Sequence, residues 1–250
     1  MAKETIPRRK FLWGAGLAGT AVAAGMAPDA AVQAQSHSQN QEQAKPASSG
    51  QEAASAAGEP EAQLILTPTE HAFVVAAVDT LIPADELSPS GSECGIATFI
   101  DRQLASAWGG GAKMYRAGPF RTGKPEQGYQ LPLTPAEFFS AGIAAANAWS
   151  RKTYGRDFDR LGAEQRAEAL KAMQDGKAEF ADFSSRAFFA RLLAITMEGF
   201  FSDPIYGGNR NMAGWRMIGF PGLPATYRNL YEEYRDKPYV VEPRSIADFS

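Results

Sequence analysis

From residue 64 onward, apolar side chains recur with the period of a helix, in blocks separated by glycine- and proline-rich stretches. Two helix starts are sharply marked, "TPTE" at 67–70 and "TPAE" at 134–137. In each, the threonine suits the N-cap, the proline loses no needed donor in the first turn, and the glutamate can reach back to the cap. The first helix should end before Pro83, and its expected buried face carries Phe73, Val74, Ala77, Val78 and Leu81.

The same periodicity predicts further helices over 96–108, after Thr134, and over 162–176, 185–201 and 225–236. The helix after Thr134 is expected to bury Phe138, Phe139, Ile143 and Trp149. The helix at 185–201 is the most apolar, so it should lie at the centre. No stretch alternates like a strand, and long loops fill 85–95 and 109–133. The pattern therefore predicts an all-α fold, an irregular helical bundle of about five to six helices with long glycine- and proline-rich loops.

The N-terminus contains "GAGLAG" at 14–19, which has the spacing of a dinucleotide-binding loop. That loop works only between a buried strand and a helix, and the charged residues before Gly14 cannot form such a strand. An export signal fits better, because basic residues precede a weakly apolar run and "AVQAQ" supplies small residues for cleavage. The adjacent arginines and the apolar pair after them suggest the twin-arginine route, with the signal carried by Arg8, Arg9, Phe11 and Leu12.

These features divide the chain into a twin-arginine signal peptide at 1–34, a linker at 35–63 and a helical domain with an extended C-terminal tail at 64–250. The linker has no aromatic residue and only alanines as apolar ones, so we expect disorder there. A retained N-terminal anchor helix is the alternative for the first segment. Since the twin-arginine route carries folded proteins, the exported chain should hold a cofactor or travel with a protein that does.

The composition offers little chemistry of its own. Cleavage after Ala34 removes four basic and two acidic residues from totals of 25 and 28, which leaves a net charge of −5 and no footprint for nucleic acid. The two histidines, His37 and His71, cannot form a histidine-rich metal site, and one cysteine cannot hold an iron–sulfur cluster. No haem-attachment, nucleophile-elbow or phosphate-loop motif is present. We therefore assign no catalytic, cofactor-binding or metal-binding residue.

The single cysteine, Cys94, has two interpretations. It is a semi-buried thiol at a helix start, or it forms a disulfide with a partner subunit, as unpaired cysteines in oxidising compartments often do.

The densest signal is the stretch 198–227, where turn residues alternate with aromatic ones. Exposed aromatic side chains on rigid turns usually form an interface, whereas a well-packed loop that closes the bundle is the alternative. The residues predicted to meet a partner are Phe201, Asp203, Tyr206, Gly207, Gly208, Asn209, Trp215 and Phe220.

This stretch resembles the gluconate 2-dehydrogenase subunit 3 family through "GFFSDPIYGGN" at 199–209, "GW" at 214–215 and "GFPG" at 219–222. "LTPTEHAFVVAAVDTLIPAD", "YRAGPF", "GYQLPLTPAEFF" and "FDRLGAEQRAEAL" are similar to the same family, so the resemblance runs from Leu66 to about Tyr234. It implies a small, non-catalytic gamma subunit in a periplasmic, membrane-associated complex.

In such a complex, a flavoprotein of the glucose–methanol–choline type carries FAD and oxidises a polyol, sugar or sugar acid. A multihaem c-type cytochrome subunit carries haem c and passes the electrons on. The resemblance implies that the small subunit stabilises the flavoprotein and lends it the export signal read by the twin-arginine translocase. A free-standing periplasmic enzyme with an unrecognised site, or a non-redox scaffold module, is the alternative function.

Overall fold

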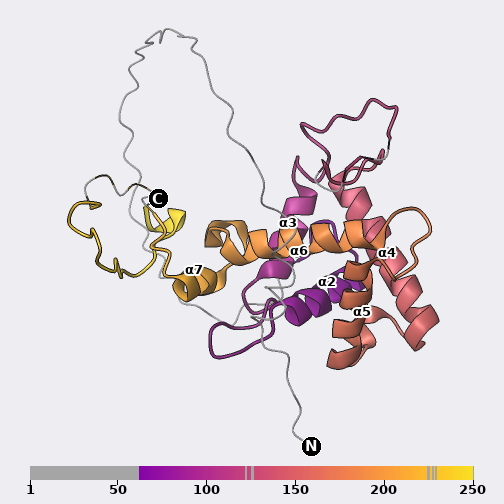
Figure 1. Cartoon of the computed structure of the whole chain (residues 1–250), viewed down its shortest axis with the longest axis horizontal. Coiled ribbons are helices and arrows are strands. Elements are labelled where there is room, and N and C mark those ends of the chain that lie inside the picture. The colour runs from indigo at the N-terminus through magenta and orange to yellow at the C-terminus, as the bar shows by residue number, and fades with distance from the viewer. Residues whose placement is uncertain are drawn as a thin grey trace, which may run out of the picture. The chain divides into compact units, whose positions relative to one another are not determined.

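The computed structural model describes residues 62–121, 123–124, 127–223, 226, 228 and 230–249. Six α-helices form the regular structure of these residues (Figure 1). They are α2 (Pro68–Leu81), α3 (Ile96–Ala105), α4 (Pro135–Tyr154), α5 (Ala163–Asp175), α6 (Ser185–Phe201) and α7 (Ala213–Ile218). Short 3-10 turns span Phe158–Arg160, Pro204–Tyr206, Arg210–Met212 and Ile246–Phe249. Because the described residues contain no strand, the all-α prediction is confirmed. Arg8, Arg9, Phe11 and Leu12 lie outside the described residues.

Both predicted capping boxes are present. The Thr67 hydroxyl accepts the Glu70 N–H at 3.3 Å, and the Glu70 carboxylate accepts the Thr67 N–H at 2.9 Å. Thr134 and Glu137 make the same pair of hydrogen bonds at 3.3 and 2.8 Å. Each box satisfies amides that have no partner within the helix, so the two helices begin where the sequence predicts.

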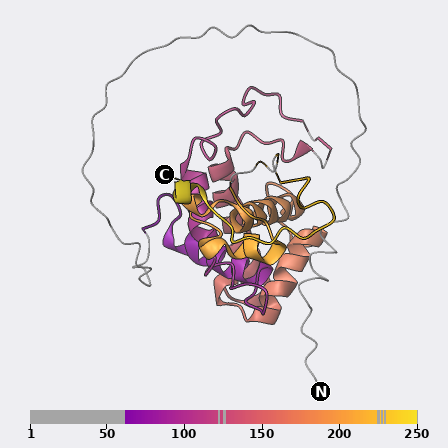
Figure 2. The same ribbon diagram turned by 90° about the vertical axis from the view of Figure 1, so that its left-hand side faces the viewer.

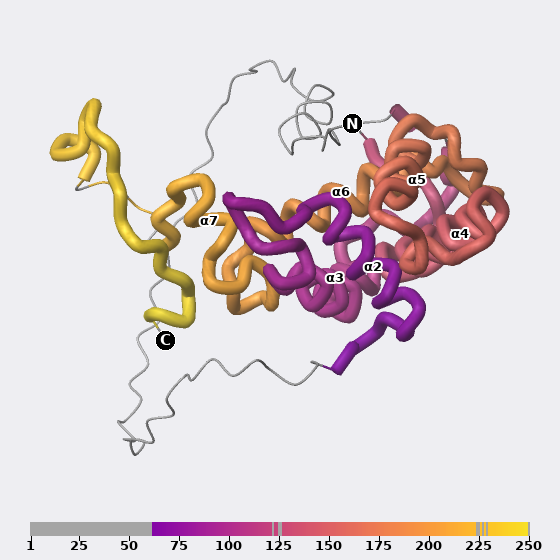
Figure 3. The backbone as a smooth tube through the Cα atoms, turned by 90° about the horizontal axis from the view of Figure 1, so that it is seen from below, coloured from indigo at the N-terminus to yellow at the C-terminus, as the bar shows by residue number. Residues whose placement is uncertain are grey.

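The central helix is α6, which packs against all five of the other helices (Figures 1 and 3). At the crossing with α4, a Cβ added to Gly142 would lie 2.1 Å from Cδ2 of Phe188, so only glycine lets the two helices approach this closely. Phenylalanine rings fill the space around the crossing, with centroids 4.7–6.3 Å apart among Phe73, Phe138, Phe158 and Phe188. These four side chains are fully buried, and the aromatic core holds the bundle together.

One helix boundary and the burial of one side chain differ from the prediction. The second helix ends at Ala105 instead of Trp108, because Ser106 is extended and its hydroxyl donates to the Gln103 carbonyl. The Trp108 N–H then donates to the same hydroxyl, which fixes a turn. Trp149 is only half-buried and packs edge-to-face on Tyr154, outside the phenylalanine core.

The C-terminal part differs more. The short helix α7 was expected to be loop, and the helix expected at 225–236 forms turns in its described residues. Among the described residues of this stretch, the one helix-type backbone bond runs from the Tyr234 N–H to the Leu230 carbonyl. An isolated helix this short is marginal in water unless one of its faces packs against the rest of the protein. The described residues of this stretch are mostly exposed and have no such packed face. None of the described helices has the length and apolar character that crossing a bilayer requires.

Candidate functional site

The segment predicted to meet a partner begins where α6 ends and turns sharply at Asp203. One oxygen of the Asp203 carboxylate accepts the Ile205 N–H at 3.0 Å and so caps the following 3-10 turn. The other oxygen accepts the N–H of Ile246, near the C-terminus, at 2.8 Å. Gly207 then takes a left-handed conformation, with a φ of 97°. Asp203 therefore joins the loop after α6 to the C-terminal tail.

Asn209 fixes the path of the next turn from inside the protein. Its side chain is fully buried, its amide nitrogen donates to the Ser202 carbonyl, and its oxygen accepts the Gly214 N–H, both at 2.8 Å. Asn209, Asn211 and Met212 all have a positive φ, between 47° and 55°. Such conformations are unfavourable for residues other than glycine, so the surrounding hydrogen bonds must enforce them.

Trp215, on α7, is also part of the interior. Its side chain is only 5% exposed, and its indole N–H donates to the Phe201 carbonyl at 2.8 Å. Phe220 packs edge-to-face on the indole, with ring centroids 5.1 Å apart. Trp215 thus joins α7 to the end of α6, and replacing it by alanine would disturb the fold as well as any interface.

The eight predicted interface residues therefore occupy different environments. Tyr206 is 50% exposed, Phe201, Asp203, Gly207 and Phe220 are half-buried, and Gly208, Asn209 and Trp215 are buried. The buried three can shape an interface but present almost no area to a partner, so direct contact remains a prediction for Tyr206 and its half-buried neighbours.

Two exposed apolar residues in the same region were missed from the sequence. Ile205 and Ile218 are 49% and 58% exposed. Aliphatic side chains are usually assigned to the core, which is why these two were passed over. A sequence signal could have identified them, because each lies beside a turn residue. Ile205 follows Pro204, and Ile218 precedes Gly219.

The C-terminal tail, residues 230–249, folds back onto this region. A short parallel bridge is formed where the Leu223 N–H donates to the Arg244 carbonyl at 2.8 Å and the Arg244 N–H donates to the Pro221 carbonyl at 3.1 Å. Gly222 lies at this bridge with a φ of 71°, and a Cβ there would lie 2.1 Å from the Arg244 oxygen. Arg216 of α7 forms an ion pair with Glu242 of the tail at 2.7 Å.

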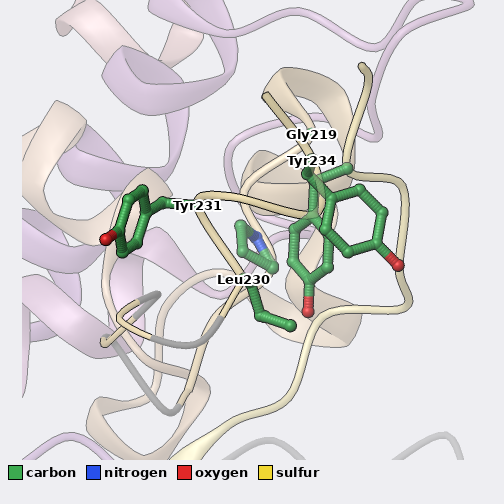
Figure 4. A pocket seen from close by; sticks show the side chains of 6 residues that line it. Gly219, Leu230, Tyr231 and Tyr234 are labelled. Carbon is green, nitrogen blue, oxygen red and sulfur yellow. The ribbon is translucent and has the colours of Figure 1, made fainter. Parts of the chain in front are cut away.

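Between these attachment points, the tail and the residues after α7 line an open aromatic pocket of about 300 Å³ (Figure 4). It is lined by Gly219, Pro221, Leu230, Tyr231, Tyr234 and Tyr239. The rings of Tyr234 and Tyr239 pack edge-to-face with centroids 4.7 Å apart, and Figure 4 shows Tyr231 turned away from Tyr234. The lining is mostly apolar and carries no charged side chain.

Cys94 lies in the loop before α3 and is 1% exposed. Its Sγ is 3.6 Å from the Pro89 carbonyl oxygen, and its own carbonyl accepts the Arg210 N–H at 3.0 Å. A disulfide to another subunit would require this thiol to reach the surface. The bridge therefore remains a hypothesis that needs local opening of the loop.

Two sets of titratable groups stand out in the described residues, Tyr129 with Arg191 and His71 beside Asp101. No group of three or more histidine, cysteine, aspartate or glutamate side chains there could hold a metal ion. Burial raises the pKa of Tyr129, whereas the Arg191 guanidinium, 5.8 Å from the ring centroid, opposes this rise. His71 lines a second cavity of about 270 Å³ beside Asp101, whose carboxylate accepts three backbone N–H groups, those of Leu64, Ile65 and Leu66.

No curated protein and no solved structure matches the chain. Residues 68–222, however, match a protein family described as gluconate 2-dehydrogenase subunit 3. The match covers more than half of the chain and includes all six helices. It begins at the first residue of α2 and ends at Gly222, which forms the bridge to the tail. The chain therefore belongs to the gluconate 2-dehydrogenase subunit 3 family.

Proposed function

We propose that this chain is the non-catalytic small subunit of a periplasmic FAD-dependent dehydrogenase complex, in which it stabilises the flavoprotein subunit and supplies its twin-arginine export signal. The observation that carries the proposal is the family match over residues 68–222. The family name describes a dehydrogenase subunit, and the match spans every helix of the described structure. A subunit of this kind acts through the surface that it offers to its partners.

The export role rests on the N-terminal sequence. Arg8-Arg9 followed by Phe11-Leu12 has the pattern of a twin-arginine signal, and that route carries proteins that are already folded. A flavoprotein that has bound FAD in the cytoplasm is a cargo of this kind. One signal on the small subunit would then export two chains as a folded pair to the periplasm.

The expected partners divide the chemistry between them. A flavoprotein of the glucose–methanol–choline type would hold FAD and oxidise a sugar, polyol or sugar acid, and a multihaem c-type cytochrome would hold haem c and carry the electrons to the respiratory chain. Membrane association would come through the complex. Substrate specificity would lie in the flavoprotein, so this chain would set the stability and location of the activity.

The export role is tested by replacing Arg8 and Arg9 together with lysine in the native host. We expect flavin-dependent dehydrogenase activity in the periplasmic fraction to fall at least about tenfold while FAD-containing protein accumulates in the cytoplasm. Lys3→Arg, which also preserves the charge of the basic region, is the matched control and should leave the activity unchanged. Unchanged periplasmic activity in the double variant would contradict the escort role.

A further inference from the structure

Exposed apolar side chains are concentrated at one end of the helical domain. Eight of the thirteen exposed large apolar residues among the described residues lie between 205 and 249, and none comes from α4, α5 or α6. The exposed residues of this end include Ile205, Tyr206, Ile218, Tyr231, Val240 and Phe249, which we call the α7-end surface. Apolar side chains that are exposed together in one region of a folded domain are typical of an interaction site.

The two halves of this surface are held together by direct bonds. Asp203 accepts the Ile246 N–H, Arg216 pairs with Glu242, and the residues after α7 bridge to Arg244. These bonds hold the tail beside the α7 region, as Figures 1 and 3 show. Figure 2 shows the same region from the α7 side. Because the backbone is fixed at several points, the exposed side chains are presented on a pre-organised frame, which lowers the entropy cost of binding.

The tail itself argues for a covering partner. Tyr231 is 58% exposed, Val240 87% and Phe249 52%, so this segment buries little apolar surface within its own chain. Its three basic and five acidic residues give no attraction to an anionic lipid surface. A folded protein with a complementary apolar surface and a polar rim fits this composition better than a membrane does.

We propose that the α7-end surface is the docking site for the flavoprotein subunit and that the C-terminal tail forms half of it. This inference rests on the proposed function. Ile205, Tyr206 and Ile218 lie within the family match, which ends at Gly222, whereas the whole tail lies beyond it. The family is described as a dehydrogenase subunit, so the part inside the match is the half that a dehydrogenase partner would meet in every member. The adjoining tail would extend this contact with residues that lie outside the match.

The test uses the affinity-tagged chain purified from its native host, with the FAD that co-purifies measured per chain by fluorescence after release. A carboxylate placed in a buried apolar contact is strongly unfavourable, so Tyr206→Asp and Val240→Asp should each lower the FAD-to-chain ratio at least about tenfold. Leu87→Asp and Tyr115→Asp replace side chains that are 61% and 79% exposed elsewhere on the domain, and they should leave the ratio within about twofold of the wild type. Far-ultraviolet circular dichroism should show equal helicity in all four variants.

Each outcome has one meaning. If the wild-type chain carries no FAD, the proposed function fails and this inference fails with it. If the wild type carries FAD and both α7-end variants keep it, the docking site is elsewhere and only this inference fails. Loss in the control variants also overturns it. Retention of FAD by Val240→Asp alone would show that the tail is not part of the interface and would overturn that half of the proposal. Size-exclusion chromatography of the same preparations measures self-association, and a variant that loses it but keeps FAD would identify a second copy of this chain as the occupant.

Discussion

The carboxylate of Asp101 accepts the backbone N–H of Leu66 at 2.9 Å, and it also accepts those of Leu64 and Ile65 at 2.6 and 3.1 Å. Asp101 lies on α3 and is 4% exposed, whereas Leu64 and Ile65 are 66% and 45% exposed. One carboxylate thus fixes three consecutive residues just before the cap of α2. It sets the point at which the chain joins the bundle, immediately after the predicted linker at 35–63.

Asp101→Asn should detach this junction. The amide nitrogen of asparagine cannot accept a hydrogen bond. At least one of the three backbone N–H groups therefore loses its acceptor and faces the NH₂ group of asparagine, which is also a donor. We expect the free energy of unfolding to fall by about 2–3 kcal/mol, measured by urea denaturation, with faster amide exchange at Leu64 and Leu66. Asp182→Asn, on an exposed side chain, should change stability by less than about 0.5 kcal/mol. Equal stability of the two variants would show that the Asp101 bonds contribute nothing net.

Two variants of Asn209 separate hydrogen bonding from backbone strain. Asn209→Gly keeps a left-handed conformation available but loses the bonds to Ser202 and Gly214, so we expect a loss of about 1–3 kcal/mol. Asn209→Ala loses the same bonds and also forces alanine to a φ near 47°, which adds about 1 kcal/mol. Thermal and urea unfolding of both proteins measure the two terms. An alanine variant as stable as the glycine variant would mean that the turn relaxes to another conformation.

The helix starts could be predicted because their signal is local. Thr67 and Thr134 each lie three residues before the glutamate that completes the capping box, and no distant residue is needed to form it. The apolar period then identified most of the residues that surround α6. Trp149 shows the limit of this reasoning, since the period gives a face of the helix but not how deeply each position on that face is buried.

The candidate site depends on contacts between distant segments, which the sequence pattern does not contain. The burial of Trp215 depends on the Phe201 carbonyl and on Phe220, and the path of the tail depends on Asp203, 43 positions before Ile246. Turn residues at 207–209 correctly indicated tight backbone turns. They did not indicate that the Asn209 side chain would turn inward and order a helix, α7, in a stretch expected to be loop.

Gly142→Ala tests the close approach of α4 and α6. In an isolated helix this change is favourable by about 1 kcal/mol, but here the new methyl group would overlap the ring of Phe188. Overpacking costs typically about 1–3 kcal/mol, so after the helix gain we expect a net loss of up to about 2 kcal/mol in the free energy of unfolding. Gly110→Ala is the control, since the nearest atom to its Cβ would be 3.6 Å away. A stabilised Gly142→Ala protein would show that the two helices separate at little cost.

Glu70 gives a pH dependence with a definite sign. Partial burial raises the pKa of Glu70, but hydrogen bonds donated by the Ser140 hydroxyl and by Thr67 outweigh it and hold the pKa below its ordinary value of 4.5. A carboxylate with a lowered pKa in the folded state stabilises the protein above pH 4.5 and loses that effect as the pH falls through the folded pKa.

We therefore expect Glu70→Gln to be less stable than the wild type at pH 7, by about 0.5 kcal/mol because the group is partly exposed, and this difference to shrink in acid. Urea denaturation of both proteins at neutral pH and well below pH 4.5 measures the change. Glu86→Gln, in an exposed loop, should show no such trend. A difference that stays constant with pH would contradict the assigned hydrogen bonds.

The burial of Cys94 makes its reactivity a measure of local opening. A thiol that is 1% exposed reacts only when the loop before α3 opens, so a disulfide reagent should modify it at least about 100-fold more slowly in the native chain than in urea. Most of the purified complex should then run on a non-reducing gel with this chain at its monomer mass. A thiol that reacts at the rate of the unfolded chain, or a band at the summed mass of two subunits, would show that the loop opens readily and would favour an intersubunit bridge through Cys94.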